Sequence, residues 1–271
     1  MSAPTEPVPR LEIRDVDKSY GGVKAVDDVS LTCGIGEVLA VIGPNGAGKT
    51  TLFGLISGDL RCDGGQIKLD GRTIDMLSAA RRARIGLSRT FQVAQIMDRL
   101  TVRENLTLAA SAAEGLATRW SRRVGIGDRL ERRVTPMADR LDLSDVMGRL
   151  GSSLSQGERK RLDIGMALVQ RPTLLLLDEP TAGMAPEDVV TLTQTLTEVH
   201  REDPDLSIFF TAHDMNVVFG LAEKVALMVE GRLVLSGTPD EMRGSAQAQA
   251  AYLGQRYAAH SDVGGVARDA V

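Results

Sequence analysis

Long apolar runs and cysteines are scarce in this 271-residue chain. The apolar runs Val38–Ile42 and Leu174–Leu177 are far shorter than the roughly 20 residues that cross a bilayer. Only Cys33 and Cys62 are present, without CxxC spacing, which excludes a disulfide scaffold and favours a reducing, cytoplasmic setting. If the protein serves a membrane, we expect another chain to provide the part that spans it.

A strong excess of positive charge is also missing. The chain has 32 basic and 36 acidic residues, a net charge of -4, so we expect no nucleic-acid partner. Residues 1–10 are proline-rich and polar, unlike a secretory signal, and the Gly- and Ala-rich residues 261–271 are predicted to be disordered. The length allows one large domain or two smaller ones.

Period-two and continuous apolar patterns predict strands in both halves of the chain. Residues 11–17 are typical of an edge strand, residues 29–33 of a half-buried antiparallel strand, and Val38–Ile42 of a parallel strand covered on both faces. Two short strands, at residues 66–69 and 72–74, flank Asp70-Gly71 as a hairpin. Further strands are predicted at residues 174–177, 206–211, 225–229 and 233–235.

Helical spacing replaces the strand pattern between residues 94 and 168. Apolar residues recur at helical intervals in residues 101–113 and 136–146. The order of elements therefore predicts an α/β fold, in which a parallel-sheet core is interrupted by a helical insertion and a small antiparallel sheet lies near the N-terminus.

A complete phosphate-binding motif, G-x-x-x-x-G-K-T, follows the apolar run Val38–Ile42. Its glycines let successive N–H groups face an anion, and a helix-like stretch adds its positive end. A glycine-rich turn with an incidental lysine would lack this strand and helix. We predict a site for ATP and Mg²⁺, with the lysine on the β- and γ-phosphates and the next hydroxyl on the metal. The residues are Gly43, Pro44, Asn45, Gly46, Ala47, Gly48, Lys49, Thr50 and, on the α-phosphate, Thr51.

Two carboxylates follow the apolar run Leu174–Leu177. We expect Asp178 to hold Mg²⁺ through water, and Glu179 to accept a proton from the attacking water. The alternative is that both residues only end the strand before Pro180. The complete phosphate motif makes the catalytic interpretation the stronger one.

Residues 154–158, Leu-Ser-Gln-Gly-Glu, resemble the LSGGQ signature of ABC ATPases and lie about 23 residues before Asp178, as in that family. The resemblance implies that Ser155, Gln156, Gly157 and Glu158 bind the nucleotide of an opposite chain. Gln156 replaces a Gly and Glu158 replaces a Gln. Ser155 and Glu158 also fit a capping box, and a capped helix start is itself an anion site, so both readings can hold.

Three single residues occupy positions that carry functions in ABC ATPases. Gln92 matches the Q-loop, which reaches the metal and the lytic water. His213 follows the strand at 206–211 and matches the H-loop, which bonds the γ-phosphate. Tyr20 matches the aromatic residue that stacks on adenine. Taken alone, each side chain could be a surface or packing residue. Residues 181–187 depart from the family's D-loop, which often reads Ser-Ala-Leu-Asp.

The resemblance implies an ABC ATPase fold, with a P-loop NTPase core of RecA type. One domain is expected over residues 8–254. Its core and antiparallel part comprise residues 8–93 and 169–245, its helical subdomain residues 94–168, and a partly disordered tail residues 246–271.

Four segments resemble ATP-binding subunits of bacterial branched-chain amino acid importers: residues 87–92, 182–184, 213–215 and 251–254. The resemblance implies a head-to-tail ATPase dimer, homo- or heteromeric, on the cytoplasmic side of the membrane. Its partners would be permease subunits and an extracytoplasmic substrate-binding protein. Residues 93–101 would form the groove for a permease helix, although their apolar side chains could equally belong to the core. The alternatives are a urea or short-amide importer, a non-transport ABC ATPase, and a P-loop kinase or GTPase, in which residues 154–158 and His213 would have no task.

Overall fold

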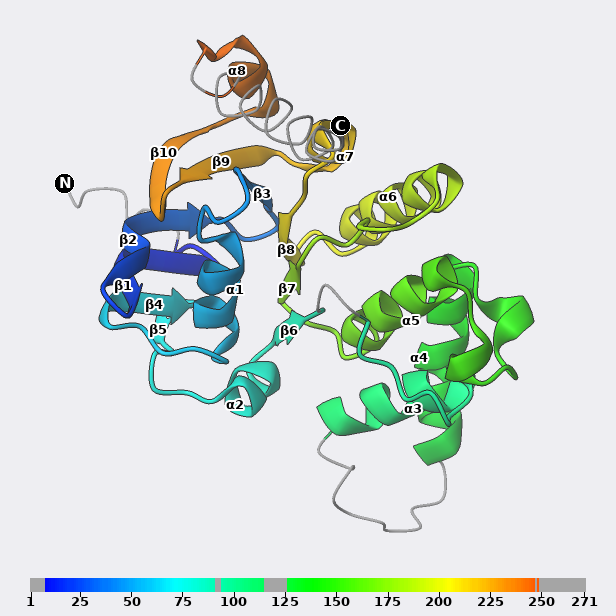
Figure 1. Ribbon diagram of the computed structural model, residues 1–271. Coiled ribbons are helices and arrows are strands. Elements are labelled where there is room, and N and C mark those ends of the chain that lie inside the picture. Colours follow the sequence, from blue (N-terminus) through cyan, green and yellow to red (C-terminus); the bar gives the residue numbers. More distant parts are fainter. Residues whose placement is uncertain (1–7, 91–93, 115–125, 247, 249–271) are drawn as a thin grey trace, which may run out of the picture.

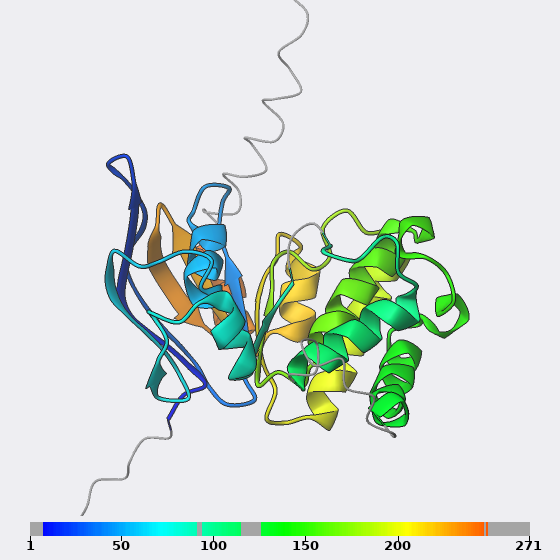
Figure 2. The ribbon, with the colours of Figure 1, turned by 90° about the horizontal axis from the view of Figure 1, so that it is seen from below.

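The computed structural model describes residues 8–90, 94–114, 126–246 and 248. Two sheets and eight α-helices make up this part of the chain. Figures 1 and 2 show a sheet-rich lobe beside a purely helical lobe. Among these residues, no helix combines the length and the apolar character that spanning a bilayer requires.

An antiparallel sheet forms the outer layer of the sheet-rich lobe. Its strand order is β2 (Val23–Cys33), β1 (Leu11–Tyr20), β4 (Gly64–Leu69) and β5 (Arg72–Thr73). The expected edge strand at residues 11–17 is therefore wrong, because β1 pairs with β2 on one side and with β4 on the other. Its partner β4 lies far along the chain, so a pattern local to β1 cannot reveal this second pairing.

The core sheet has the order β10, β9, β3, β8, β7, β6, and every pair is parallel except β9 with β10. Val38–Ile42 forms β3 and Leu174–Leu177 forms β7, and both strands are buried at every residue, as their continuous apolar sequence predicts. The other strands are β6 (Leu87–Arg89), β8 (Ser207–Thr211), β9 (Lys224–Val229) and β10 (Arg232–Gly237). Because β3, β7 and β8 are adjacent and parallel, the loops after them meet at one edge of the sheet.

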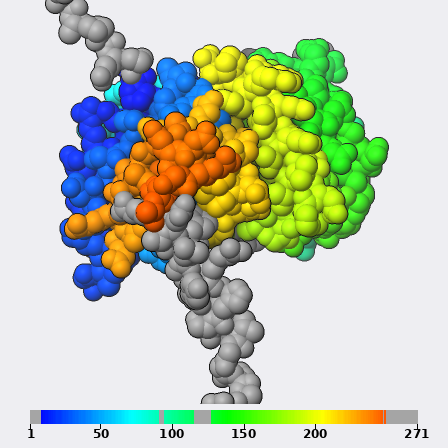
Figure 3. Space-filling view, turned by 90° about the horizontal axis from the view of Figure 1, so that it is seen from above, coloured from blue at the N-terminus to red at the C-terminus, as the bar shows by residue number. Residues whose placement is uncertain are grey.

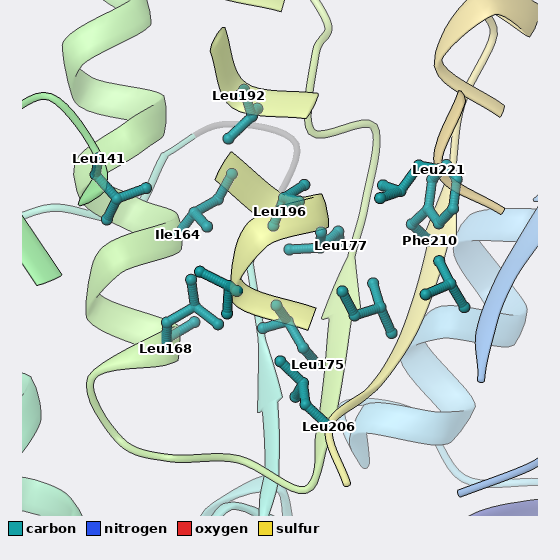
Figure 4. Packing of buried hydrophobic residues seen from close by; sticks show 14 of the residues in the cluster. Leu141, Ile164, Leu168, Leu175, Leu177, Leu192, Leu196, Leu206, Phe210 and Leu221 are labelled. Atoms are coloured by element: carbon teal, nitrogen blue, oxygen red, sulfur yellow. The ribbon is translucent and has the colours of Figure 1, made fainter. Parts of the chain in front are cut away.

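Alternate residues of these strands face two separate hydrophobic clusters. Leu175 and Leu177 pack into one cluster with the helices on their side, while Leu174 and Leu176 pack into the other beneath the antiparallel sheet. Figure 4 shows the first cluster, where Ile164 and Leu196 meet the strands. The helical lobe thus shares a core with the sheet and is positioned by it.

The described part of the chain contains eight α-helices. Helices α3, α4 and α5 form the helical lobe, as the sequence predicts for residues 94–168. Figure 3 shows β10 and α8 on the surface, between the N-terminal strands and α6–α7. The helices are α1 (Lys49–Ser57), α2 (Ala79–Arg84), α3 (Val102–Ala113), α4 (Ile126–Arg140), α5 (Gln156–Leu168), α6 (Pro186–Glu202), α7 (Met215–Leu221) and α8 (Pro239–Gly244).

The helix expected at residues 136–146 is wrong in its bounds. Pro136 lies inside α4, which ends at Arg140. A short 3-10 turn, Ser144–Val146, follows. Asp142 has a φ of 52°, in the left-handed region, and an α-helix cannot continue through that conformation. The apolar spacing of residues 136–146 is therefore shared between two elements.

Candidate active site

The loop between β3 and α1 has a backbone that only glycine fits at two positions. Gly43 and Gly48 have φ values of 149° and 96°. A Cβ atom on Gly43 would lie 2.0 Å from the Met228 carbonyl oxygen, and one on Gly48 would lie 2.1 Å from that of Ala25. The glycine spacing thus reflects close approach of β9 and β2 to this loop, as well as the turn itself.

Lys49 crosses the mouth of the loop. Its Nζ donates to the carbonyl oxygens of Gly43, at 2.7 Å, and Pro44, at 2.9 Å. The side chain is buried, and burial lowers its pKa, while the charges of Glu179 and Asp178 oppose that shift. These two carboxylates follow β7. The negative charges at the end of β7 therefore act on the lysine that ends the loop after β3.

Asp178 and Glu179 are held together by Thr211 of β8. The Thr211 hydroxyl donates to Asp178 Oδ1 at 2.9 Å and accepts from the backbone N–H of Glu179 at 2.9 Å. Glu179 has a φ of 48°, which is unusual for a residue other than glycine and common at functional sites. The two neighbouring carboxylates differ in their exposure to solvent: Asp178 is buried, and Glu179 is half-buried.

His213 reaches Glu179 from the loop after β8. Its Nε2 lies 2.6 Å from Glu179 Oε1. The His213 side chain is 41% exposed and that of Glu179 is 17% exposed, so the pair borders the surface. The structure therefore brings together Lys49, Asp178, Glu179 and His213.

Residues 155–158 lie elsewhere, at the start of α5. Ser155 is the N-cap: its Oγ accepts from the Glu158 N–H at 3.2 Å, and Glu158 Oε2 accepts from the Ser155 N–H at 2.6 Å. This geometry confirms the predicted capping box. Burial by itself would raise the pKa of Glu158. The bonds to Ser155 and the positive charges of Arg149 and Arg161 outweigh burial and hold this pKa below its usual value. Glu158 is thus an anion inside a motif expected to meet phosphate.

The altered signature packs against the altered D-loop of the same chain. A Cβ on Gly183 would lie 2.5 Å from Gln156 Nε2, and Gly183 has a φ of 73°. A Cβ on Gly157 would lie 2.3 Å from Asp188 Oδ2, and Asp188 is itself paired with Arg161 at 2.5 Å. Gln156 therefore occupies space that the glycine at position 183 leaves open, which links the departures in the two motifs.

The remaining predicted residues are only partly placed. Tyr20 is the last residue of β1, and its ring lies near the Lys18 ammonium group. Tyr20 is 47% exposed, so its ring does not pack in the hydrophobic core. Thr50 is exposed and Thr51 is half-buried at the start of α1. Gln92 lies outside the described residues.

Sequence reasoning missed two cationic side chains beside the carboxylates, the partly buried Arg89 and the buried Lys160. Arg89, the last residue of β6, donates from Nη2 to Asp178 Oδ2 at 3.3 Å. Lys160 of α5 is 4% exposed, and burial lowers its pKa against the charges of Asp163, Asp178 and Glu179. A basic residue just before the Q-loop position was the available signal for Arg89. Lys160 carries no comparable signal.

Comparison with known proteins decides the family. The model of the family described as "ABC transporter" matches residues 26–182. The chain belongs to the ABC transporter family. It is an ATP-binding, ATP-hydrolysing subunit, with hydrolysis coupled to transmembrane transport.

Two curated relatives of this ABC ATPase are similar at nearly the same level. The high-affinity branched-chain amino acid transport ATP-binding protein LivG of Salmonella typhimurium is 34% identical over 253 residues, covering 91% of this chain and 98% of LivG. The lipopolysaccharide export system ATP-binding protein LptB of Haemophilus influenzae is 33% identical over 247 residues, with coverage of 91% and 98%.

Solved structures confirm the predicted fold of this ABC ATPase. A nucleotide-free ATP-binding cassette from an ABC transporter matches with a TM-score of 0.78 at 26% identity, over 90% of this chain and 98% of that one. The cbiO1 protein of Clostridium perfringens, part of the ABC transporter complex cbiONQ, matches with a TM-score of 0.74 at 27% identity, over 89% and 92%.

Proposed function

We propose that this ABC ATPase energises an importer of branched-chain or other hydrophobic amino acids. Its 34% identity to LivG supports this assignment. Local sequence supports it further, because three segments resemble the same group of importers: residues 87–92, 182–184 and 213–215. Urea or short-amide import is the related alternative.

Lipopolysaccharide export is a second candidate, because LptB is 33% identical over the same share of the chain. Overall identity does not separate the two relatives. The assignment of the substrate therefore depends on the local motifs, and a transport assay tests it.

The chemistry we propose is in-line attack of water on the γ-phosphorus of ATP. Glu179 accepts the proton of the attacking water, the bond from the γ-phosphorus to the bridging oxygen breaks, and ADP and phosphate leave. The single observation that carries this proposal is the hydrogen bond of 2.6 Å between Glu179 and His213, which orients the carboxylate. Lys49 lies where it can stabilise the negative charge of the phosphates.

Asp178 and Thr50 offer the hard oxygen donors that Mg²⁺ prefers, a carboxylate and a hydroxyl. No group of three or more His, Cys, Asp or Glu side chains forms a metal cage in the described part of the chain. Such a sparse donor set fits Mg²⁺, which protein sites usually hold through one or two carboxylates and substrate phosphates. The ion, when bound, supplies charge neutralisation to the β- and γ-phosphates. We propose that Gln92 adds a further oxygen.

Ser155 and Gln156 are exposed at the start of α5, and no described contact joins them to Lys49 or to the loop before it. We propose that they complete the phosphate site of a second ATPase subunit, head to tail. The proposed assembly places this pair under permease subunits at the cytoplasmic face of the membrane, with a substrate-binding protein on the other side.

The experiment is isolation of the native membrane complex through an affinity tag on this chain, followed by reconstitution into liposomes with ATP on the side of the ATPase. Uptake of radiolabelled leucine, dependent on a substrate-binding protein, is the expected result. Uptake of urea would move the assignment to the related importers, and extraction of lipopolysaccharide without uptake would favour the exporter.

A further inference from the structure

We infer that Arg89 competes with the metal ion for Asp178, and so limits how tightly this site holds Mg²⁺. The inference rests on the proposed role of Asp178 as the metal-holding carboxylate. It concerns a residue at the end of β6 whose side chain is 10% exposed, next to an aspartate side chain that is 6% exposed. Charges so far from water are weakly screened by salt.

The described contacts at the two ends of the Arg89 guanidinium differ in length. Nη1 donates to Asp59 Oδ2 at 2.7 Å and to Ser57 Oγ at 2.8 Å; Ser57 is the last residue of α1, and Asp59 follows its C-cap. Nη2 reaches Asp178 Oδ2 at 3.3 Å. Charge-assisted N–H···O bonds are usually about 2.7–2.9 Å long. The bond to Asp59 is therefore the anchor, and the contact with Asp178 is the looser, displaceable one.

The two oxygens of Asp178 have different neighbours. Oδ1 accepts from the Thr211 hydroxyl at 2.9 Å, which fixes the carboxylate plane. Oδ2 faces Arg89. A divalent cation that approaches Oδ2, directly or through water, meets the positive charge of the guanidinium, and the two cations repel each other. Metal binding then weakens the Nη2 contact, while Nη1 stays on Asp59.

Two substitutions should consequently act in opposite directions. Arg89→Gln removes the competing charge, so we expect the affinity for the metal to rise roughly tenfold. Asp59→Ala removes the anchor and leaves the guanidinium able to bind both oxygens of Asp178, so we expect that affinity to fall. Asp59 is 40% exposed, which makes its substitution readily tolerated. A purely structural role of the cluster would lower the affinity in both variants.

The test uses the full-length chain saturated with a non-hydrolysable ATP analogue. Mn²⁺ is the probe, and unbound Mn²⁺ is measured by electron paramagnetic resonance. Binding of the analogue in EDTA reports on folding and on the phosphate loop, and should change less than about threefold in both variants, because neither substitution touches Lys49. Arg14→Gln removes one exposed positive charge from β1, 59% exposed, and is the matched control.

The outcomes separate this inference from the proposed function. If the unaltered chain binds no Mn²⁺ with the analogue, the assignment of Asp178 fails, and the proposed site fails with it. If it binds Mn²⁺ but Arg89→Gln leaves the affinity unchanged or lowers it, competition by Arg89 is overturned. A rise in affinity in Asp59→Ala would overturn it independently, even if Arg89→Gln did not fold.

Discussion

His213 Nε2 lies 2.6 Å from Glu179 Oε1, although 34 positions separate the two residues in the sequence. Each follows a strand of the same parallel sheet, β8 and β7, so the pairing is a consequence of strand adjacency. The Glu179 backbone is fixed by its N–H bond to the Thr211 hydroxyl, and its side chain is fixed by the imidazole. His213 is accordingly the residue that aims the proposed base.

The first prediction concerns this imidazole. His213→Ala should lower kcat for ATP hydrolysis on the order of 10²-fold, because the Glu179 carboxylate loses its orientation. KM for ATP should change much less, since Lys49 and its loop remain. His200→Ala is the matched control, because that ring bonds the Leu206 carbonyl oxygen away from the site. A His213→Ala protein with unaltered kcat would exclude this role.

Glu179→Gln should abolish hydrolysis while ATP binding is retained. The amide keeps the size of the side chain but cannot accept the proton of the attacking water. If two chains close around ATP, the uncleaved nucleotide should also prolong the dimer, as measured by size-exclusion chromatography with ATP present. Glu198→Gln, an exposed position on α6, should behave like the unaltered protein. Normal turnover in Glu179→Gln would show that another group is the base.

Lys49→Ala should lower ATP turnover by roughly 10² or more, at about 1.4 kcal/mol for each factor of ten. Lys49 is 6% exposed and lies across the phosphate loop. Lys68→Ala, which removes a side chain from β4 that pairs with Glu12, supplies the comparison for loss of one lysine. Steady-state ATPase kinetics measure both variants, and equal activities would remove the assignment of the loop.

Sequence predicted those parts of the site that depend on consecutive residues. The loop ending in Lys49, the carboxylates after β7 and the capping box at Ser155 each lie within a few positions of a strand or helix end. Local patterns suffice there, because the backbone conformation itself imposes the residue types.

Pairings between distant segments were not predictable in the same way. The position of β1 inside its sheet depends on β4. The hydrogen bonds from Arg89 to Asp59 and to Asp178 likewise join residues that lie far apart in the sequence. The fit of Gln156 against Gly183 likewise appears only when α5 and the loop before α6 are packed together. Such contacts follow from tertiary packing, which no single window of sequence contains.

Cys33 provides a test of the core under the antiparallel sheet. Burial raises the pKa of its thiol far above the usual value, so the thiolate that reacts with iodoacetamide hardly forms in the folded protein. At pH 8.5, native Cys33 should stay unlabelled and Cys62 should label slowly, whereas both should label quickly in guanidinium chloride. Mass spectrometry of labelled peptides measures this difference.

The same shift makes stability depend on pH. The folded pKa of Cys33 is raised above the unfolded value of about 8.5, so its contribution is complete below that pH. Above it the unfolded chain releases the proton first, and the free energy of unfolding should fall by up to about 1.4 kcal/mol per pH unit. Cys33→Ala should remove this part of the slope. A slope that is identical in the two proteins would contradict the burial of the thiol.

Ser155 has two proposed tasks, and one pair of substitutions separates them. Ser155→Ala removes the N-cap of α5, so the free energy of unfolding should fall by about 1 kcal/mol. Ser155→Asp keeps a good N-cap but places a negative charge where a phosphate of the partner's nucleotide is expected. Its stability should therefore match that of the unaltered protein, while ATP-dependent dimerisation and hydrolysis are lost.

Denaturant unfolding and size-exclusion chromatography read these two properties independently. Ser245→Asp supplies the charge control, because Ser245 lies beyond α8 and its hydroxyl accepts only from the Ala248 N–H among the described contacts. A Ser155→Asp protein that dimerises with ATP and hydrolyses it normally would show that residue 155 caps the helix without meeting phosphate. Loss of both stability and dimerisation would instead mean that the aspartate fails as a cap, and Ser155→Asn, neutral and equally good as an N-cap, would then restore both.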